Sequence, residues 1–277
     1  DLEKAVHLLS EKIYKDDIHF VLELIQNAED EGAHELTIFL DQNKVIVINN
    51  GRTFSKKDVK AICSIGGGDK KKKIGFMGIG FKSVFHITDV PQVISGQFNF
   101  IIDDYLYPEP QDSFNIESFD YKPKSGAIFV LPLTKKYQDN LDDFTKRLFD
   151  VDEKILLFLS NLRKIHFIDA TKKTVSKWSY ERITDGDLES LINTKTDYKD
   201  TWRVFKKIIQ VEDKSLIKGV EDKEEIEKTT IIVAFPSPNI ESINKCKSEP
   251  LYCYLPTEKP VQLPFILQAD FIPNAGR

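Results

Sequence analysis

The stretch "HFVLELIQNAEDEGA", His19–Ala33, decides how the first part of the chain folds, because its apolar and polar residues recur at helical spacing. At about 100° per residue, Glu23, Asn27 and Asp30 fall within an arc of about 60°. The opposite side of the helix is apolar and carries Phe20, Val21, Leu24, Ile25 and Ala28. The stretch therefore predicts an amphipathic helix whose polar side gathers two carboxylates and a carboxamide.

This polar side has two interpretations, a solvated face and a functional site. A carboxylate such as Glu23 can orient or deprotonate a water molecule, and the amide oxygen of Asn27, one turn away, can ligate a hard cation. Asp30 either takes part in such a site or faces water. The sequence downstream of the helix decides between the two interpretations.

Composition limits the kind of protein. A chain of 277 residues with 41% hydrophobic and 30% charged residues can bury a core, and its length suits one large or two ordinary domains. The net charge of -5 gives no electrostatic footprint for nucleic acid, and apolar runs such as "ILLFLSNL" are too short to span a bilayer. Three cysteines without metal-type spacing leave an odd thiol, which fits a reducing compartment. We therefore expect an intracellular protein, cytoplasmic or nuclear, with neither a nucleic-acid nor a membrane partner.

The first part of the chain is expected to mix helices with strands up to about residue 172. "ELTIFLD" and "KVIVINN" flank "DQNK" as a β-hairpin, and "FSKKDVKAI" predicts a short helix with Ser55 as its N-terminal cap. Further strands are expected in "PQVISG", "FNFII", "AIFVLPL" and "RKIHFIDA", with one long helix from about Asn140 to Leu162 before the last of them. Residues 1–172 form the first predicted domain.

Residues 173–277 have a different sequence pattern, in which strand-like runs are separated by charged or proline-rich turns. Examples of these runs are "TWRVFKKII", "EKTTIIVAFPSP" and "LPFILQADF". The chain stops at "IPNAGR", which is an unusual place for a domain to end. We expect a second α+β domain over residues 173–277 that is truncated at its C-terminal end.

A glycine-rich stretch, "IGFMGIGFKSVF", follows the first hairpin and the short helix. Gly75, Gly78 and Gly80 have the spacing G-x-x-G-x-G, and a helical pattern resumes at Phe81, so exposed backbone N–H groups and a helix start would form a phosphate cradle. The stretch does not follow a strand inside a βαβ unit, and no Gly-Lys-Ser/Thr follows it. These features argue against a Rossmann fold and a Walker loop.

The polar helix face and the glycine cradle together suit magnesium triphosphate. In this combination the sequence resembles the GHKL ATPases, a superfamily that includes gyrase B, the ninety-kilodalton heat-shock chaperones, sensor histidine kinases and the mismatch-repair MutL proteins. Four segments carry the resemblance. "ELIQNAEDEGA" is similar to the first motif of the family, and "INNGRTF" lies where the family has Asp-x-Gly-x-Gly. "GFMGIGFKSVF" is similar to the lid motif, and "SGAIFVLPL" lies at the late-strand motif.

The resemblance implies ATP as the bound nucleotide, Mg2+ as the metal and an α+β fold of the Bergerat type. In that fold helices lie on a mixed sheet, and a smaller transducer-like α+β domain follows. The resemblance also implies that Glu23 activates water and that Asn27 ligates magnesium. The other nucleotide contacts that it implies fall on Asp30, Asn49, Gly51, Gly75, Gly78, Ile79, Gly80, Phe81, Lys82 and Ala127. Of these, Lys82 either approaches a phosphate or points outward.

Three positions depart from the family pattern. Asn49 stands where the family usually has the aspartate that accepts the adenine amine, Thr53 replaces a glycine, and Ala127 replaces a threonine. A carboxamide oxygen accepts a weaker hydrogen bond than a carboxylate does. These departures bear on base selectivity and favour, as an alternative, a nucleotide switch that does not hydrolyse.

A catalytic cation is expected from the second domain. In related ATPases a basic residue after the nucleotide domain reaches the terminal phosphate, and "FIPNAGR" resembles the equivalent segment. Such a cation stabilises the charge that develops on the phosphoryl oxygens. The resemblance assigns this role to Arg277 or, alternatively, to Gln268.

Within the superfamily, "GFMGIGFKSVFHITDVPQVISG" and "YLPTEKPVQLPFILQADFIPNAGR" resemble the sacsin and plant No Vein group of chaperone-like ATPases. The resemblance implies slow, gated ATP hydrolysis in which lid closure remodels a protein client or drives ATP-dependent dimerisation with a second copy. The alternatives are a non-hydrolysing nucleotide switch and the ATPase module of a DNA-processing or defence protein. Turnover by the isolated chain is left to experiment.

Overall fold

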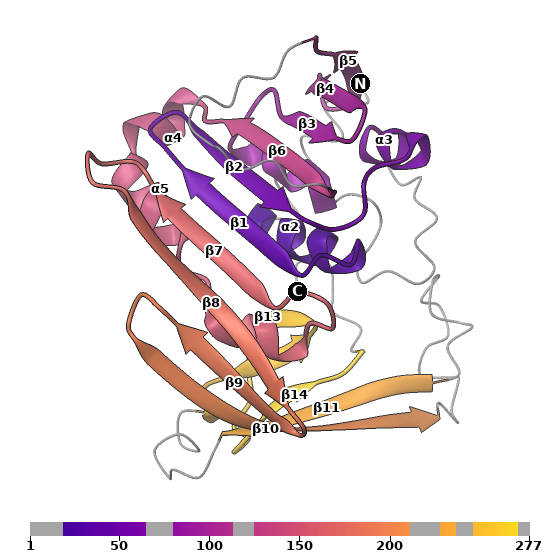
Figure 1. The fold of residues 1–277 in the computed structure, drawn as a ribbon, viewed down its shortest axis with the longest axis vertical. Coiled ribbons are helices and arrows are strands. Elements are labelled where there is room, and N and C mark those ends of the chain that lie inside the picture. Colours follow the sequence, from indigo (N-terminus) through magenta and orange to yellow (C-terminus); the bar gives the residue numbers. More distant parts are fainter. Residues whose placement is uncertain (1–18, 65–79, 113–124, 211–227, 237–245, 271–277) are drawn as a thin grey trace. The chain divides into compact units, whose positions relative to one another are not determined.

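The computed structural model of the chain describes residues 19–64, 80–112, 125–210, 228–236 and 246–270 (Figure 1). The chain divides into two compact units. The first comprises residues 1–152 and 160–180, and the second comprises residues 153–159 and 181–277. Residues 153–159 thus belong to the second unit, although they lie between two segments of the first unit in the sequence. The predicted domains 1–172 and 173–277 stay a prediction.

The first unit is built on a mixed sheet with the strand order β7-β1-β2-β6-β3-β4-β5. Its strands are β1 (Glu35–Leu40), β2 (Lys44–Asn49), β3 (Gln92–Ser95), β4 (Phe98–Asp103), β5 (Tyr107–Pro110), β6 (Ala127–Pro132) and β7 (Lys164–Asp169). β1 and β7 are parallel, and the other neighbours are antiparallel. The predicted hairpin on either side of "DQNK" is confirmed, because β1 and β2 pair antiparallel from Leu36 and Asn49 to Leu40 and Val45.

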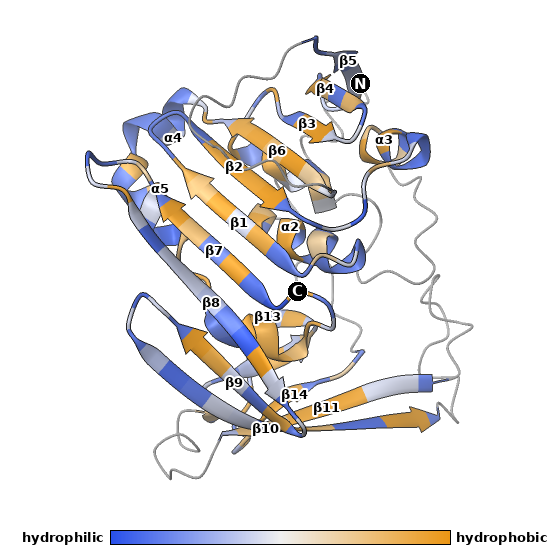
Figure 2. Cartoon of the chain, viewed as in Figure 1, coloured by the Kyte–Doolittle hydropathy of each residue, from blue (hydrophilic) through white to orange (hydrophobic). Residues whose placement is uncertain are grey.

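The central strands are buried on both faces, which explains their nearly continuous apolar runs (Figure 2). On one face Phe39 pairs with Ile46 and Ile48 pairs with Ile128, and these four side chains form a buried cluster. The side chains between them, such as Val47, point to the other face. In Figure 1 α2 (His19–Asp30) overlaps β1 and β2. The sheet and α2 thus fix the backbone around the predicted site.

Among the short helices, α3 (Lys56–Ile62) matches its sequence prediction. Ser55 is the N-terminal cap, and the Asp58 carboxylate accepts the Ser55 backbone N–H at 2.7 Å. The two residues form a capping box, the reciprocal arrangement that stabilises a helix start. The prediction of this helix and its cap is confirmed.

The predicted long helix from Asn140 to Leu162 is wrong. The structure has α4 (Lys135–Asp139), α5 (Leu141–Leu148) and a separate 3-10 helix, η2 (Glu153–Phe158). Residues 155–159 are five consecutive apolar residues, and all five are buried. Such a run lacks the spacing of a helix with one buried side, so the apolar content of this region was mistaken for helical periodicity.

The second unit is also sheet-rich, with the strand order β9-β10-β11-β14-β12-β13. These strands are β9 (Leu188–Asn193), β10 (Tyr198–Gln210), β11 (Lys228–Pro236), β12 (Pro250–Cys253), β13 (Leu255–Pro260) and β14 (Ile266–Gln268). β8 (Ser176–Asp185) runs from the first unit into the second. The chain is thus a mixed α/β protein with a large mixed sheet and few helices. No helix within the described ranges is long and apolar enough to cross a membrane.

Candidate functional site

The N-terminal half of α2 brings Glu23 against the glycine-rich segment. The Glu23 side chain is only 7% exposed, and a Cβ added to Gly80 would lie 2.0 Å from its Oε2. Gly80 begins the 3-10 helix η1 (Gly80–His86), and His19 Nδ1 lies 3.8 Å from Glu23 Oε1. The carboxylate therefore occupies the place that a side chain at position 80 would take, and Glu23 does not lie on a solvated face.

Asn27 and Asp30 follow Glu23 on the same helix, and both side chains are half-buried. The Asn27 backbone carbonyl accepts the Glu31 N–H at 3.1 Å as the helix ends. Within the part of the chain that the structure describes, no group hydrogen-bonds the Asn27 carboxamide. Asn27 thus offers an oxygen one helical turn from the Glu23 carboxylate.

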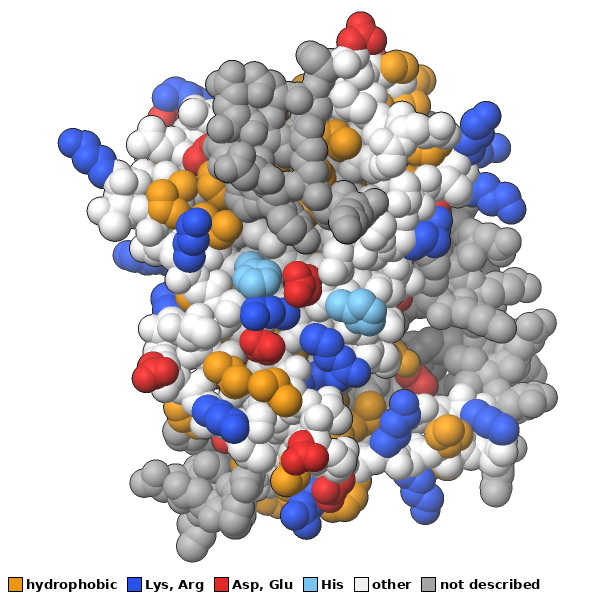
Figure 3. Space-filling view, in the orientation of Figure 1, with side chains coloured by type: hydrophobic (Ala, Val, Ile, Leu, Met, Phe, Trp, Pro, Cys, Tyr) orange, Lys and Arg blue, Asp and Glu red, His pale blue; other side chains and the backbone are white. Residues whose placement is uncertain are grey.

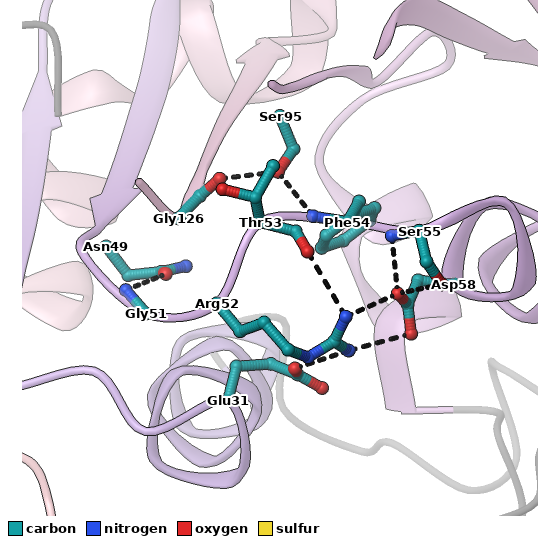
Figure 4. Close-up of polar contacts among 10 residues, drawn as sticks. All are labelled: Glu31, Asn49, Gly51, Arg52, Thr53, Phe54, Ser55, Asp58, Ser95 and Gly126. Carbon is teal, nitrogen blue, oxygen red and sulfur yellow. Dashed lines mark hydrogen bonds and ion pairs between the residues drawn. The ribbon is translucent and has the colours of Figure 1, made fainter. Parts of the chain in front are cut away.

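At the other end of α2, three backbone segments approach one another closely around Asn49 (Figure 4). Asn49 ends β2, and its Oδ1 accepts the Gly51 N–H at 3.1 Å. Ala127 lies directly opposite Asn49 in β6. A Cβ on Gly51 would lie 2.8 Å from the Glu31 carbonyl oxygen, and a Cβ on Gly126 would lie 2.0 Å from that of Asn49. Gly126 has φ +98°, in the region that favours glycine, so both glycines are required by this close approach.

An ion-pair network holds the loop after β2 in place (Figure 4). Arg52 Nη2 lies 2.6 Å from Glu31 Oε2, and its guanidinium donates two bonds of 2.9 Å to the Asp58 carboxylate. The Asp58 hydrogen bonds and the Glu31 charge raise the pKa of Arg52, although partial burial opposes the shift. Burial also disfavours the Asp58 carboxylate, but its bonds to Arg52 and Ser55 outweigh that effect and hold its pKa well below the usual range. The network links α2 to α3.

Ser95, at the end of β3, joins two more segments of the same region. Its hydroxyl accepts the Phe54 N–H at 2.9 Å and donates to the Gly126 carbonyl. Ser95 therefore connects the loop after β2 with the residue that precedes β6. No sequence pattern indicates this role, because serine is common in strands and turns.

Lys82 and Phe81, two predicted phosphate contacts, are buried in η1. The Lys82 ammonium group donates to the carbonyls of Ile62, at 2.8 Å, and Tyr105. Burial lowers the pKa of Lys82 to about 8, against a smaller opposing effect of Cys63. The Phe81 ring lies 5.6 Å from that of Phe129. Lys82 thus ties η1 to the C-terminal end of α3 and does not point outward, while its approach to a phosphate stays a prediction.

Glu29 is the main residue of this region that sequence reasoning missed. Its carboxylate is buried, and it accepts backbone N–H bonds from Ser160 at 2.7 Å, Asn161 at 3.0 Å and Leu162 at 2.8 Å. The signal was its place on the helical wheel, about 120° from Glu23 and beside the apolar side. A carboxylate there predicts burial with dedicated donors, since an unsatisfied buried charge is costly.

The described residues include only part of the predicted site, whose functional roles stay a prediction. Gly75, Gly78, Ile79 and Arg277 lie outside the described residues. Gln268, the alternative to Arg277, is fully buried in β14, between its partners in β11 and β12. Its amide nitrogen and oxygen have no hydrogen-bond partner in the chain as the structure describes it. Among the described members of the predicted set, Glu23 lies against Gly80, and Asn49 lies against Gly51 and opposite Ala127.

The chain is similar to known proteins both in sequence and in fold. Residues 42–117 match a family model described as "Sacsin domain". The chain is 26% identical over 305 aligned positions to Protein NO VEIN of Arabidopsis thaliana, which covers 100% of this chain and 11% of that protein. It is 26% identical over 238 positions to sacsin of Homo sapiens, which covers 63% of this chain and 5% of sacsin. These similarities support a sacsin-like module that spans a small part of the length of either relative.

The fold itself is similar to that of a solved structure. A crystal structure of the N-terminal domain of a DNA repair protein matches 95% of this chain and 86% of that chain, with a TM-score of 0.58 and 13% identity. At this identity the likeness concerns the fold alone. It agrees with the mixed α/β architecture of the chain.

Proposed function

We propose that the chain binds ATP with Mg2+ and hydrolyses the γ-phosphate, as a GHKL-type ATPase module whose helices lie on the sheet in Bergerat fashion. One observation carries the proposal. The buried Glu23 carboxylate lies against Gly80 of the glycine-rich segment, one helical turn from the Asn27 carboxamide. Two oxygen-bearing side chains beside a side-chain-free backbone suit a phosphate group that must approach closely.

The residues present fit a magnesium ion of the kind that accompanies a nucleotide. Magnesium typically takes one or two protein oxygens and fills its other positions with phosphate and water. The Asn27 oxygen can be that protein ligand, and the described ranges contain no group of three or more His, Cys, Asp or Glu side chains that could form a cage for a metal. When bound, the ion supplies positive charge to the phosphate oxygens.

In the proposed reaction Glu23 accepts a hydrogen bond from a water molecule and aligns it for attack on the γ-phosphate. Gly80 and the neighbouring glycine-rich residues would donate backbone N–H groups to the phosphates. Asn49, Gly51 and Ala127 would contact the adenine base. Glu23 lies on α2 and Glu31 directly follows the last residue of that helix, so the phosphate end and the adenine end lie about 12 Å apart along the helix axis. A single extended nucleotide can therefore contact both groups.

We further propose slow, gated hydrolysis of chaperone-like type, in which lid closure changes contacts with a protein client or a second copy of the chain. The similarity to sacsin and NO VEIN supports this proposal. Residues 173–277 would act as the transducer-like domain, and Arg277, or alternatively Gln268, would reach the terminal phosphate. If Arg277→Ala leaves turnover unchanged in a chain extended past residue 277, the catalytic cation comes from elsewhere.

The experiment that tests the proposal is phosphate release from magnesium ATP, with nucleotide binding followed in the same samples. Glu23→Ala should lower turnover by about 100-fold or more while ATP still binds, because a positioned general base contributes at least this much. Asp142→Ala is the matched control, since its carboxylate is exposed on α5. A chain that binds no ATP would refute the proposal, and equal turnover in the parent and Glu23→Ala would remove Glu23 from the mechanism.

A non-hydrolysing nucleotide switch is the second candidate. Asn49 and Ala127 favour it, because neither supplies the carboxylate or hydroxyl of the GHKL pattern, and Asn49 Oδ1 already accepts the Gly51 N–H. Binding of ATP without phosphate release in either the parent or Glu23→Ala would select the switch. The same outcome in a chain extended past residue 277 would exclude a missing catalytic cation as its cause.

A further inference from the structure

The outer half of the β10–β11 ribbon has an open edge. β11 pairs with β10 from Trp202 to Gln210, whereas β9 pairs with β10 only from Tyr198 to Arg203. In the part of the chain that the structure describes, residues 205–210 of β10 therefore have a strand on one side alone. An unpaired edge is a template for a further strand.

The backbone groups that face this edge can be identified. The Val204 N–H donates to the Asp187 carbonyl at 2.9 Å, so residue 204 directs its backbone groups toward the β9 side. Because these directions alternate along an antiparallel strand, Lys206, Ile208 and Gln210 direct their N–H and C=O groups toward the open edge. By the same alternation, Phe205, Lys207 and Ile209 direct their backbone groups toward β11.

Large apolar side chains are exposed along the same ribbon. Phe205 is 50% exposed and Ile208 is 62% exposed, and Ile209 and Phe235 are each 38% exposed. The ring centroids of Phe205 and Phe235 lie 6.1 Å apart, so the two rings form one apolar surface. Figure 3 shows hydrophobic side chains between Lys and Arg side chains over this part of the molecule. Phe205, Ile209 and Phe235 lie on one face of the ribbon, and Ile208 lies on the other. Exposed apolar side chains therefore flank the open edge on both faces, as is typical of an interaction surface.

The ribbon is basic in a chain whose net charge is -5. Residues 203–210 and 228–236 include four basic residues and no Asp or Glu. Two neighbouring acids are already engaged: Asp187 lies 3.5 Å from Arg203, and Asp270 accepts the Thr229 hydroxyl at 2.8 Å. Lys206 and Lys207 have no ion-pair partner among the residues that the structure describes. Their charges favour an acidic ligand.

We propose that the Phe205–Gln210 edge binds an extended, acidic segment of a partner protein, which adds a strand beside β10. An antiparallel segment would place apolar side chains beside Phe205, Ile208 and Ile209, and carboxylates beside Lys206 and Lys207. The N-terminal residue of the partner segment would lie opposite Gln210 and its sixth residue opposite Phe205. From the first to the sixth residue, the side chains that match β10 are polar, apolar, apolar, acidic, acidic and apolar. This surface is separate from the residues assigned to ATP, so the inference does not depend on the nucleotide.

The probe for this proposal is a fluorescein-labelled peptide with the core Thr-Val-Val-Glu-Glu-Val, whose binding to the 277-residue chain is followed by fluorescence anisotropy. Ile208→Pro removes one N–H that faces the open edge and leaves the ladder to β11 intact, so affinity should fall about tenfold or more. Ile208→Val keeps the N–H and is the matched control. Lys206→Glu combined with Lys207→Glu should abolish binding and create affinity for the peptide with Lys-Lys in place of Glu-Glu.

A second version of the probe tests the edge without changing the protein. N-methylation of the peptide amides that face β10 removes their donors and should weaken binding to the unchanged chain by a similar factor. Equal affinity of the parent chain for the methylated and unmethylated peptides, or for the Glu-Glu and Lys-Lys peptides, would overturn the proposal. Concentration-dependent dimerisation that Ile208→Pro abolishes would also overturn it, because a second copy would then occupy the edge.

Discussion

The two halves of α2 each carry a buried glutamate, and the two carboxylates have different surroundings. Glu29, 3% exposed, accepts backbone N–H bonds from three consecutive residues, 160–162. Glu23, 7% exposed, lies against the Cα of Gly80, with His19 at 3.8 Å. Burial is nearly the same for both side chains, so burial does not distinguish structure from function here.

The two carboxylates differ in the groups that they contact. Glu29 meets a set of donors fixed by the backbone, and such a set both satisfies the charge and fixes the segment after residue 159. Glu23 lies directly against the backbone of a residue without a side chain, so the carboxylate itself fills the space that a side chain at position 80 would need. The C-terminal half of α2 is therefore expected to control stability and the N-terminal half to control activity.

Gly126→Ala should produce the largest effect, and it acts at the close backbone approach of Asn49, Gly51 and Gly126 beyond the C-terminal end of α2. The added Cβ would lie 2.0 Å from the Asn49 carbonyl oxygen and 2.9 Å from the Gly51 nitrogen, both of which are backbone atoms. We expect the free energy of unfolding to fall by about 4 kcal/mol or more, in the range of severe steric substitutions. Urea denaturation measures it. Gly32→Ala is the control, because its φ is also positive, +71°, but no atom lies within 4 Å.

Glu29→Ala should come next. Three backbone N–H groups would lose their charged acceptor in a buried environment, so the free energy of unfolding should fall by about 3 kcal/mol. Denaturation curves of the parent, Glu29→Ala and Glu29→Gln measure the loss, and the glutamine variant, which keeps one oxygen acceptor, should fall between the other two. A stability equal to that of the parent would show that the donors bind water equally well.

Gly80→Ala tests the N-terminal half. The new methyl group would meet Glu23 Oε2 at 2.0 Å, and the end of that side chain can turn away. The free energy of unfolding should therefore change little, whereas phosphate release should fall about tenfold or more, equivalent to about 1.4 kcal/mol. Parallel measurements of ATP binding and urea unfolding separate the two effects. A stability loss as large as that of Glu29→Ala would contradict the expectation that the N-terminal half of α2 controls activity and not stability.

Asp58→Asn should have the smallest effect, and it depends on pH. The pKa of Asp58 is depressed in the folded protein, so its stabilising contribution is complete above the unfolded pKa, near 4, and is lost as pH falls further. The Arg52–Asp58 pair is partly exposed, which limits the difference from the parent to about 1 kcal/mol at pH 7. Unfolding free energies at pH 7 and pH 3 should show this difference shrink at the lower pH.

The sequence allowed prediction of features that depend on neighbouring residues. The hairpin on either side of "DQNK" and the helix capped by Ser55 follow from turn and cap chemistry within a few residues. The contacts of Glu29 with residues 160–162 and of Lys82 with Tyr105 join positions far apart in the chain. No local pattern specifies such partners, although the place of Glu29 on the helical wheel signalled that one existed.

The same reasoning explains the failure between Asn140 and Leu162. Apolar content there is high because residues 155–159 are buried, not because they repeat at helical spacing. Helical periodicity holds only for α5, which ends at Leu148 and buries Phe144 and Leu148. A single helix was expected where the chain instead forms two short elements that contribute to different units.

The brief passage of residues 153–159 through the second unit makes that unit discontinuous in sequence. A fragment that stops before residue 181 keeps the apolar segment Ile155–Leu159 but lacks the rest of the unit in which it is buried, including the Arg182 side chain that donates to the Leu157 carbonyl at 3.1 Å. Such a fragment would expose this segment and tend to aggregate. Chimeras and truncations of this module should therefore exchange or retain both stretches together, because no single cut separates the two units.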